Sequence, residues 1–165
     1  MLAPMPARSF LHKAALPLLT LLTLSSAQGA QWRFGVQAST LLPDNFGLAA
    51  TVGGHLSVQG AVSRSLDLRG LLEGNVGLNR APEVRLDLTL LKNSGSLYYG
   101  GGIGSGLLAD FGDPGSGIPL IVYSPLLLAN VHGVLGYDFG GPRLEGMARL
   151  GPNPGVGLRA SFPLR

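Results

Sequence analysis

A histidine and a serine at positions 55 and 57 are of the types that perform acid–base and nucleophilic chemistry. His55-Leu56-Ser57 separates the two side chains by one residue. A catalytic base must lie ~2.6–3.2 Å from its nucleophile, whereas two residues on one face of an extended strand are ~6.8 Å apart. We therefore expect no catalytic residues and no enzyme.

A metal or nucleotide site is equally unsupported by residue spacing. His55 and His132 lie far apart in a chain without cysteine, and a metal needs three or four convergent ligands. The glycine-rich run 98–106 (YYGGGIGSG) lacks the GxGxxG spacing, and no GK[ST] occurs. Small residues in a crowded strand explain the run better. We expect no metal and no cofactor, with both histidines hydrogen-bonded in a polar network.

The pattern that positions these residues is clearest in 66–78 (LDLRGLLEGNVGL). Its even positions are apolar or glycine, whereas Asp67, Arg69 and Glu73 stand at odd positions. A period of two is that of a β-strand with one apolar and one charged face. In a soluble protein the apolar face packs in the core, and in a membrane barrel it faces lipid.

The same alternation recurs along the chain, broken by clusters of Pro, Asn and Gly. An even number of strands joined by hairpins is what a closed barrel needs, because closure leaves no unpaired edge in lipid. We predict an all-β, eight-stranded antiparallel up-and-down transmembrane β-barrel. The predicted strands are 32–40, 48–59, 66–78, 84–90, 97–107, 127–138, 143–150 and 156–162.

Charges fall on the faces opposite the apolar ones, where they would line the lumen. An eight-stranded barrel fills its interior with side chains, and enclosed charges must pair. Six cations and five anions nearly balance, so we expect a structural ion-pair network. The predicted network is Arg33, Asp67, Arg69, Glu73, Arg85, Asp87, Asp138, Arg143, Glu145, Arg149 and Arg159.

Aromatic residues are expected near both rims, as in a barrel that crosses two membrane interfaces. One group would lie at the rim that carries the termini, and the other at the opposite rim. The first group is Trp32, Tyr98, Tyr137, Phe139 and Phe162, and the second is Phe46, Phe111 and Tyr123.

Composition favours the membrane alternative. Only 13% of residues are charged, against ~25% in ordinary soluble domains. A secreted soluble ligand-binding barrel would need a more charged surface. The pI of about 9.7 comes partly from the N-terminus, and no basic run with interleaved aromatics indicates nucleic acid.

The N-terminus has the pattern of an export signal. Arg8 and Lys13 precede the apolar run 14–24, and small residues end at Ala27. A membrane-spanning helix would need ~20 apolar residues. We predict a cleaved signal peptide over 1–27, with cleavage after Ala27 or Ala30, and a single outer-membrane barrel domain over 28–165. This placement implies the outer membrane of a diderm bacterium.

Residues 32–162 resemble the small eight-stranded outer-membrane barrels of the OmpA/OmpX-like and opacity-porin-like group. The resemblance rests on the closing hairpins, GVLGYDF (133–139), RLEGMARL (143–150) and VGLRASF (156–162). It implies outer-membrane lipid and the barrel-insertion machinery as partners. His55-Leu56-Ser57 also resembles the His-x-Ser of lipid A deacylases, but it stands in the second predicted strand rather than near the C-terminus.

The expected role is structural, or surface contact through the irregular stretch 109–123, because loops carry function more often than scaffolds do. A narrow small-solute pore and a soluble exported ligand-binding barrel are the alternatives. We expect a monomer. The candidate contact residues are Asp110, Phe111, Asp113 and Ile118.

Overall fold

The computed structural model describes residues 29–41, 50–77, 80–110, 120–122, 129–152 and 154–164. The predicted signal peptide, 1–27, lies outside the described residues, and so do three of the four candidate loop residues, Phe111, Asp113 and Ile118. Among the described residues no helix is long and apolar enough to cross a membrane. The described strands are β1 (Gln31–Leu41), β2 (Ala50–Ala61), β3 (Leu66–Gly77), β4 (Arg80–Ser94), β5 (Leu97–Asp110), β6 (Leu120–Val122), β7 (Asn130–Asp138), β8 (Arg143–Leu150) and β9 (Gly155–Pro163).

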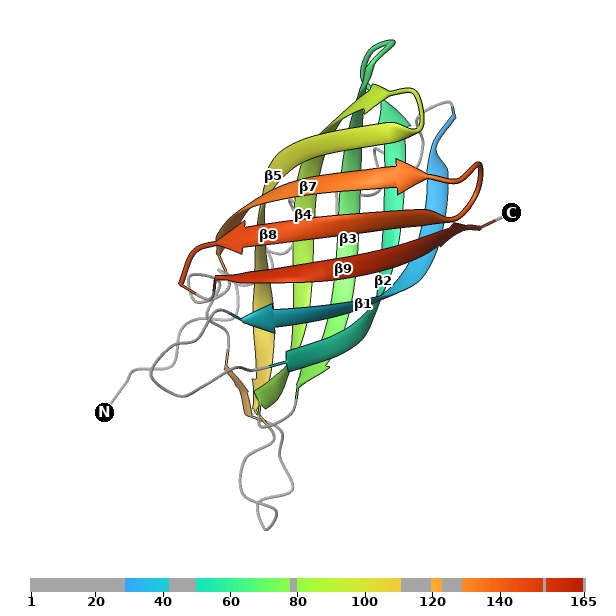
Figure 1. Cartoon of the computed structure of the whole chain (residues 1–165). Coiled ribbons are helices and arrows are strands. Elements are labelled where there is room, and N and C mark those ends of the chain that lie inside the picture. Colours follow the sequence, from blue (N-terminus) through green and yellow to red (C-terminus); the bar gives the residue numbers. More distant parts are fainter. Residues whose placement is uncertain are drawn as a thin grey trace.

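Eight of these strands form a closed antiparallel barrel (Figure 1). Each strand pairs with its neighbour in the chain, β5 pairs directly with β7, and β9 pairs with β1 to close the ring. The closing pair runs from Arg33 opposite Pro163 to Leu41 opposite Gly155. The predicted eight-stranded up-and-down barrel is therefore confirmed, and its closure satisfies the backbone groups that an open sheet would leave unpaired.

The region 109–123 contains more strand than the sequence analysis expected. β5 continues to Asp110, and β6 pairs with its end, Leu108 opposite Val122 and Asp110 opposite Leu120. The prediction of one irregular stretch was wrong at both ends. The apolar tripeptide Leu-Ile-Val is short, but it has the residue types that favour a strand once a partner edge is available.

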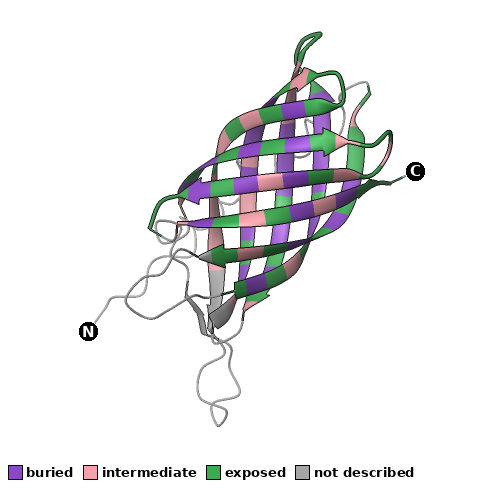
Figure 2. Ribbon diagram, viewed as in Figure 1, coloured by how far each residue is buried: buried purple, intermediate pink, exposed green. Residues whose placement is uncertain are grey.

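Residues alternate between buried and exposed along the barrel strands (Figure 2). In β7 every second residue from Asn130 to Gly136 is buried, and the residues between them are exposed. Away from the strand ends, exposed positions are apolar or glycine: Ile103 is 64% exposed and Leu158 62%. The outer surface of the barrel thus carries the apolar face of each strand, and the lumen carries the polar one.

The rim where β1 begins and β9 ends is called here the terminus rim. It carries three tight connections, 62–65, 95–96 and 139–142, and Gly95 and Gly140 adopt φ angles of 65° and 85° in two of them. Positive φ is a conformation that glycine adopts at little cost. The connections at the far rim include the longest one, between β5 and β7.

Exposed aromatic side chains gather near the terminus rim. Tyr98 is the exception to the predicted group: it is 3% exposed and points into the lumen, while Tyr99 points outward. The prediction of Tyr98 in a rim belt was therefore wrong, because strand parity turns adjacent residues to opposite faces. The predicted far-rim aromatics Phe46, Phe111 and Tyr123 lie outside the described residues. The outward aromatics are Trp32, Phe34, Tyr99, Tyr137, Phe139 and Phe162.

Candidate functional site

The lumen is lined by charged and amide side chains that are removed from solvent. Of the eleven charged residues predicted there, eight are less than 9% exposed, and Asp67, Asp138 and Arg143 are half-buried towards the terminus rim. All eleven are side-chain hydrogen-bonded or ion-paired to other residues that face the lumen or its mouth. The eight buried ones are Arg33, Arg69, Glu73, Arg85, Asp87, Glu145, Arg149 and Arg159.

Two ion pairs cross the full width of the lumen. Arg69 of β3 donates to both carboxylate oxygens of Glu145 in β8, at 2.5 and 3.1 Å. Arg149 of β8 donates back to Glu73 of β3 at 2.6 Å. In the closed ring β3 and β8 lie on opposite walls, so these pairs join the walls through the interior.

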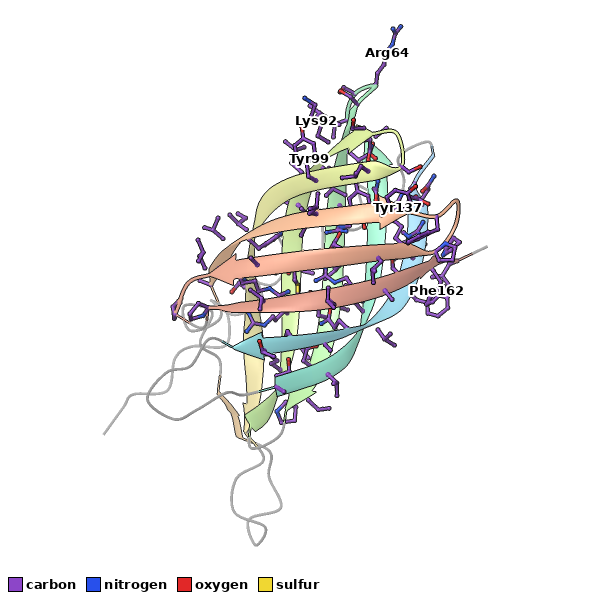
Figure 3. The ribbon with its side chains drawn as sticks, viewed as in Figure 1. Arg64, Lys92, Tyr99, Tyr137 and Phe162 are labelled. Atoms are coloured by element: carbon purple, nitrogen blue, oxygen red, sulfur yellow. The ribbon has the colours of Figure 1, made fainter. Side chains whose placement is uncertain are left out.

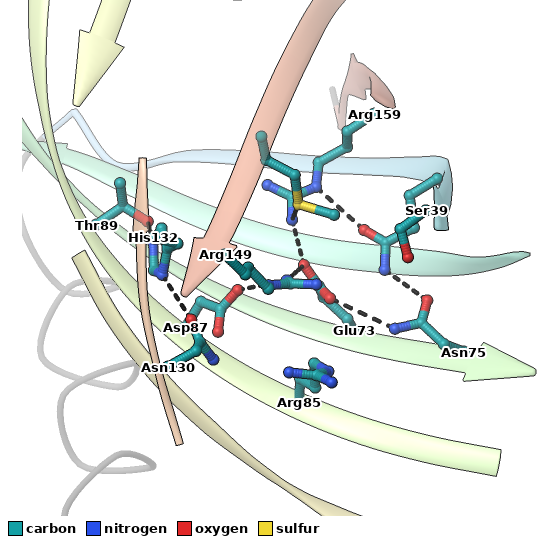
Figure 4. Close-up of polar contacts among 12 residues, drawn as sticks. Ser39, Glu73, Asn75, Arg85, Asp87, Thr89, Asn130, His132, Arg149 and Arg159 are labelled. Atoms are coloured by element: carbon teal, nitrogen blue, oxygen red, sulfur yellow. Dashed lines mark hydrogen bonds and ion pairs between the residues drawn. The ribbon is translucent and has the colours of Figure 1, made fainter. Parts of the chain in front are cut away.

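A third arginine links the two crossing pairs into one chain. Arg159 of β9 donates to Glu145 at 2.6 Å and also to Glu73. Arg149 further contacts Asp87 of β4 at 2.7 Å. Three guanidinium groups and three carboxylates therefore alternate as a neutral cluster, much of which is visible in Figure 4. Neutrality and multiple hydrogen bonds are what make buried charges tolerable.

The cluster continues through amides to a carboxylate that the sequence analysis omitted. Gln37 bridges Arg159 and Asn75, and Asn75 donates to Glu83 at 3.1 Å. Glu83 in turn accepts two hydrogen bonds from Arg85, at 2.9 and 3.1 Å. The signal that could have found it was parity, because position 83 is in phase with the inward Arg85 and Asp87. With Glu83 included, the described lumen holds six arginines and six carboxylates.

A second polar group lies nearer the terminus rim. Arg143 donates to Asp138 and to Gln59, both at 2.6 Å, and its guanidinium lies 5.2 Å from the centre of the Tyr98 ring. Asp67 accepts from Gln59 and Asn93, both at 2.6 Å. Arg33 reaches Ser161 and the Gly141 carbonyl. Two open cavities of about 660 and 210 Å³ lie at this mouth, lined mainly by polar atoms.

An apolar cluster inside the lumen was also missed by the sequence analysis. It consists of Leu91, Tyr98, Val134 and Met147, each 7% exposed or less. These residues sit at inward positions of four strands, where the sequence pattern indicated charges. Their apolar contact adds to the filling of the lumen, which is packed by side chains as expected for eight strands.

The candidate chemical residues are inside the same lumen. His132 is hydrogen-bonded to Thr89 at 2.9 Å and to Asn130 at 3.1 Å, as expected for a network histidine. His55 is buried, but neither ring nitrogen has a hydrogen-bond partner among the described residues, so the prediction of a hydrogen-bonded His55 was wrong. Ser57 is therefore out of hydrogen-bond reach, so the pair lacks the geometry of base and nucleophile. No described group of three His, Asp or Glu could hold a metal.

The inward face of β5 is a row of glycines that leaves room for neighbouring side chains. A Cβ at Gly102 would lie 2.8 Å from both the Thr89 Cα and His132 Nε2. A Cβ at Gly104 would collide with the Asp87 carboxylate. On the neighbouring strand β7, a Cβ at Gly136 would collide with the ring of Tyr98 from β5. The glycines of the 98–106 run therefore make space for the lumen network.

We expect Gly102→Ala to destabilise the barrel by roughly 1–3 kcal/mol, the usual cost of overpacking a filled interior. The measurement is urea unfolding of the refolded protein in detergent micelles. Gly133→Ala is the matched control, since its Cβ would point outward with its nearest neighbour at 3.9 Å. Equal stability of the two variants would contradict the assignment of the inward face.

The fold, a closed eight-stranded antiparallel barrel, is shared with solved outer-membrane proteins. Two solved structures show it. The chain superposes on Ail, the attachment invasion locus protein of Yersinia pestis, with a TM-score of 0.51 and 10% identity, covering 81% of this chain and 96% of that one. The N-terminal β-barrel domain of Pseudomonas aeruginosa OprF gives a TM-score of 0.52 and 13% identity, covering 84% and 100%.

Comparison of the sequence with known families and proteins adds no further relative. No family model and no curated protein matches the chain. The two barrels therefore establish architecture, and the role of this chain has to be argued from its own residues.

Proposed function

We propose that this protein is an outer-membrane barrel of a diderm bacterium with a structural or surface-interaction role, its lumen closed by the arginine–carboxylate network. The observation that carries the proposal is the inverted distribution of polarity. Away from the strand ends, exposed positions are apolar or glycine, whereas most of the described arginines and carboxylates are buried in the lumen. An apolar outer surface of this kind is stable when it contacts membrane lipid.

The soluble ligand-binding barrel fits this distribution poorly. Such a barrel would hold an apolar ligand in an apolar interior and present charge to water. Here Glu73 is fully buried in the lumen while Val36 and Leu158 are 62% exposed. The terminus rim, with its tight connections, corresponds to the periplasmic end of the barrel, because periplasmic turns are short and extracellular loops longer.

Gel mobility and fractionation test the membrane proposal first. We expect the protein in the outer-membrane fraction, with a faster-migrating band before boiling that shifts on boiling, because a closed barrel resists unfolding by detergent. Recovery in the soluble export fraction without a mobility shift would overturn the proposal and restore the soluble alternative.

Bilayer conductance separates the closed barrel from the narrow pore. Because Arg69–Glu145 and Arg149–Glu73 join opposite walls, we expect the reconstituted barrel to produce no conductance steps in planar bilayers. A suitable positive control is a larger porin reconstituted in the same way. Reproducible unitary steps from the purified protein would favour the pore.

A surface role would fall to the connection between β5 and β7. Residues 111–119 there lie outside the described part of the chain, so Phe111, Asp113 and Ile118 stay candidate contacts on sequence grounds, together with Asp110 at the end of β5. The Ail structure is a complex with the heparin analogue sucrose octasulfate, which shows that a barrel of this fold holds a ligand. Replacing 111–119 with a short Gly-Ser linker should leave the heat-modifiable band intact and abolish any surface contact that the loop makes.

A further inference from the structure

Two cations break the separation of polarity at one corner of the barrel. Among residues whose side chains are described, Arg64 and Lys92 are the only charged ones classed as exposed. Neither side chain forms an ion pair or a hydrogen bond with any other described residue. Every acidic residue whose side chain is described is in the lumen or at its mouth. The nearest in register is Asp67, whose carboxylate accepts from Gln59 and Asn93 rather than from either cation.

The backbone holds the two cations on neighbouring elements. Lys92 of β4 stands opposite Leu66 of β3 and Tyr99 of β5. The next amide, of Asn93, donates to the Ser65 carbonyl at 3.0 Å, which fixes the turn that carries Arg64 beside the end of β4. Figure 3 shows Arg64, Lys92 and Tyr99 at the same end of the barrel.

The corner lies at the border between the apolar wall and the aqueous rim. On the membrane side of Lys92, Leu90 and Ile103 are outward and 47% and 64% exposed, and Tyr99 opposite Lys92 is 46% exposed. Tyr at this level is typical of the headgroup region of a membrane. A lysine two residues beyond the last lipid-facing leucine can lay its stem along the wall and keep its ammonium at the headgroups.

We propose that Arg64 and Lys92 form a binding site for the phosphate of an anionic phospholipid in the periplasmic leaflet. This proposal rests on the outer-membrane location proposed above. The phosphate would accept hydrogen bonds from the Arg64 guanidinium and the Lys92 ammonium. The acyl chains would lie along the apolar wall on the membrane side of Lys92, at Leu90 and Ile103. Each cation near an anionic membrane surface contributes about 1 kcal/mol of attraction, which predicts roughly fivefold selectivity per cation.

The test uses tryptophan quenching by brominated lipids in vesicles. The chain contains one tryptophan, Trp32, on β1 and away from the corner. The double substitution Trp32→Phe/Tyr99→Trp moves the only indole to the register partner of Lys92. Mixed vesicles carry either brominated phosphatidylglycerol with ordinary phosphatidylcholine, or the reverse, and the ratio of quenching gives the relative affinity at that position.

We expect the indole at position 99 to prefer phosphatidylglycerol by at least fivefold at low salt. Adding Arg64→Gln and Lys92→Gln should bring the preference close to one. Arg80→Gln is the matched control, because it removes one positive charge from the far end of the same strand and should leave the preference unchanged. The native Trp32 protein reports the wall away from the corner and should show little preference.

The possible results distinguish failure of the phospholipid site from failure of the outer-membrane location. Quenching by both lipids without a preference at position 99 overturns the phospholipid site while leaving the membrane barrel in place. A preference that survives Arg64→Gln/Lys92→Gln also overturns it. Absence of quenching by either brominated lipid overturns the membrane location, and the phospholipid site with it.

Discussion

Glu73→Gln should destabilise the barrel by about 3–5 kcal/mol, the usual cost of removing one partner from a buried ion pair. Glu73 is fully buried and accepts from Arg149 at 2.6 Å and from Arg159. The glutamine is nearly the same size, so the change removes charge with little change in packing. Two guanidinium groups then share one fewer carboxylate inside the lumen. Urea titration in micelles, followed by Trp32 fluorescence and by the fraction of heat-modifiable band, measures the loss.

Asp67→Asn is the matched control for this prediction. Asp67 is half-buried near the terminus rim, and its described partners are the neutral amides of Gln59 and Asn93. An asparagine keeps one acceptor oxygen, so we expect a cost within the ~0.5–1.5 kcal/mol of an ordinary hydrogen bond. If Asp67→Asn costs as much as Glu73→Gln, the cross-lumen cluster has no special role in stability.

A double substitution that removes one anion and one cation tests whether the lost charge balance causes the destabilisation. In Glu73→Gln/Arg159→Gln one cation leaves with the anion, and the ion pairs Arg69–Glu145 and Arg149–Asp87 remain. We expect the double variant to be more stable than Glu73→Gln alone, since the penalty arises from an uncompensated charge. A double variant that loses the sum of both single changes would contradict this account.

Ile103→Arg should cost about 2–4 kcal/mol, because it places a cation on the lipid face near the middle of the apolar band. Ile103 is 64% exposed on the outer wall, four residues along β5 from Tyr99 at the interface. The arginine has no inward route, since strand parity keeps its side chain outside. The yield of heat-modifiable band after refolding into vesicles and the urea midpoint are the measurements.

Depth within the membrane provides the control for Ile103→Arg. Ser94 is exposed at the terminus rim, at the end of β4, and the cost of a cation falls to ~0–1 kcal/mol near the interfaces. Ser94→Arg should therefore fold in normal yield. Equal tolerance of both arginines would mean that the wall around Ile103 faces water, which would favour the soluble alternative.

The sequence by itself determined the strands and their parity. Strict alternation through 66–78 indicated an extended element with charges on one face, because only a strand repeats every two residues. Once Arg69 and Glu73 are assigned to one face, every neighbour in the strand is assigned as well. The number of strands and the antiparallel order followed from eight such segments joined by hairpins, and the resemblance of the closing hairpins to small outer-membrane barrels agreed with them.

Parity also explains where the sequence analysis failed. Tyr98 was placed in the aromatic group by its distance from the rim, whereas the face depends on odd or even position, so Tyr98 faces the lumen and Tyr99 the outside. Glu83 is in phase with Arg85, but it follows Pro82 in a stretch that was assigned to a turn. Strand β6 was missed because three residues carry too little alternation to be recognised without their partner, the end of β5.

Only the tertiary structure decided which charges meet. Arg69 and Glu145 are 76 residues apart. Nothing in the local sequence determines which of the six carboxylates pairs with Arg69. Barrel closure sets β3 opposite β8 and thereby brings these two side chains together across the lumen. The local pattern of a strand fixes the face of each residue, whereas its ion-pair partner depends on the circumference and stagger of the closed ring.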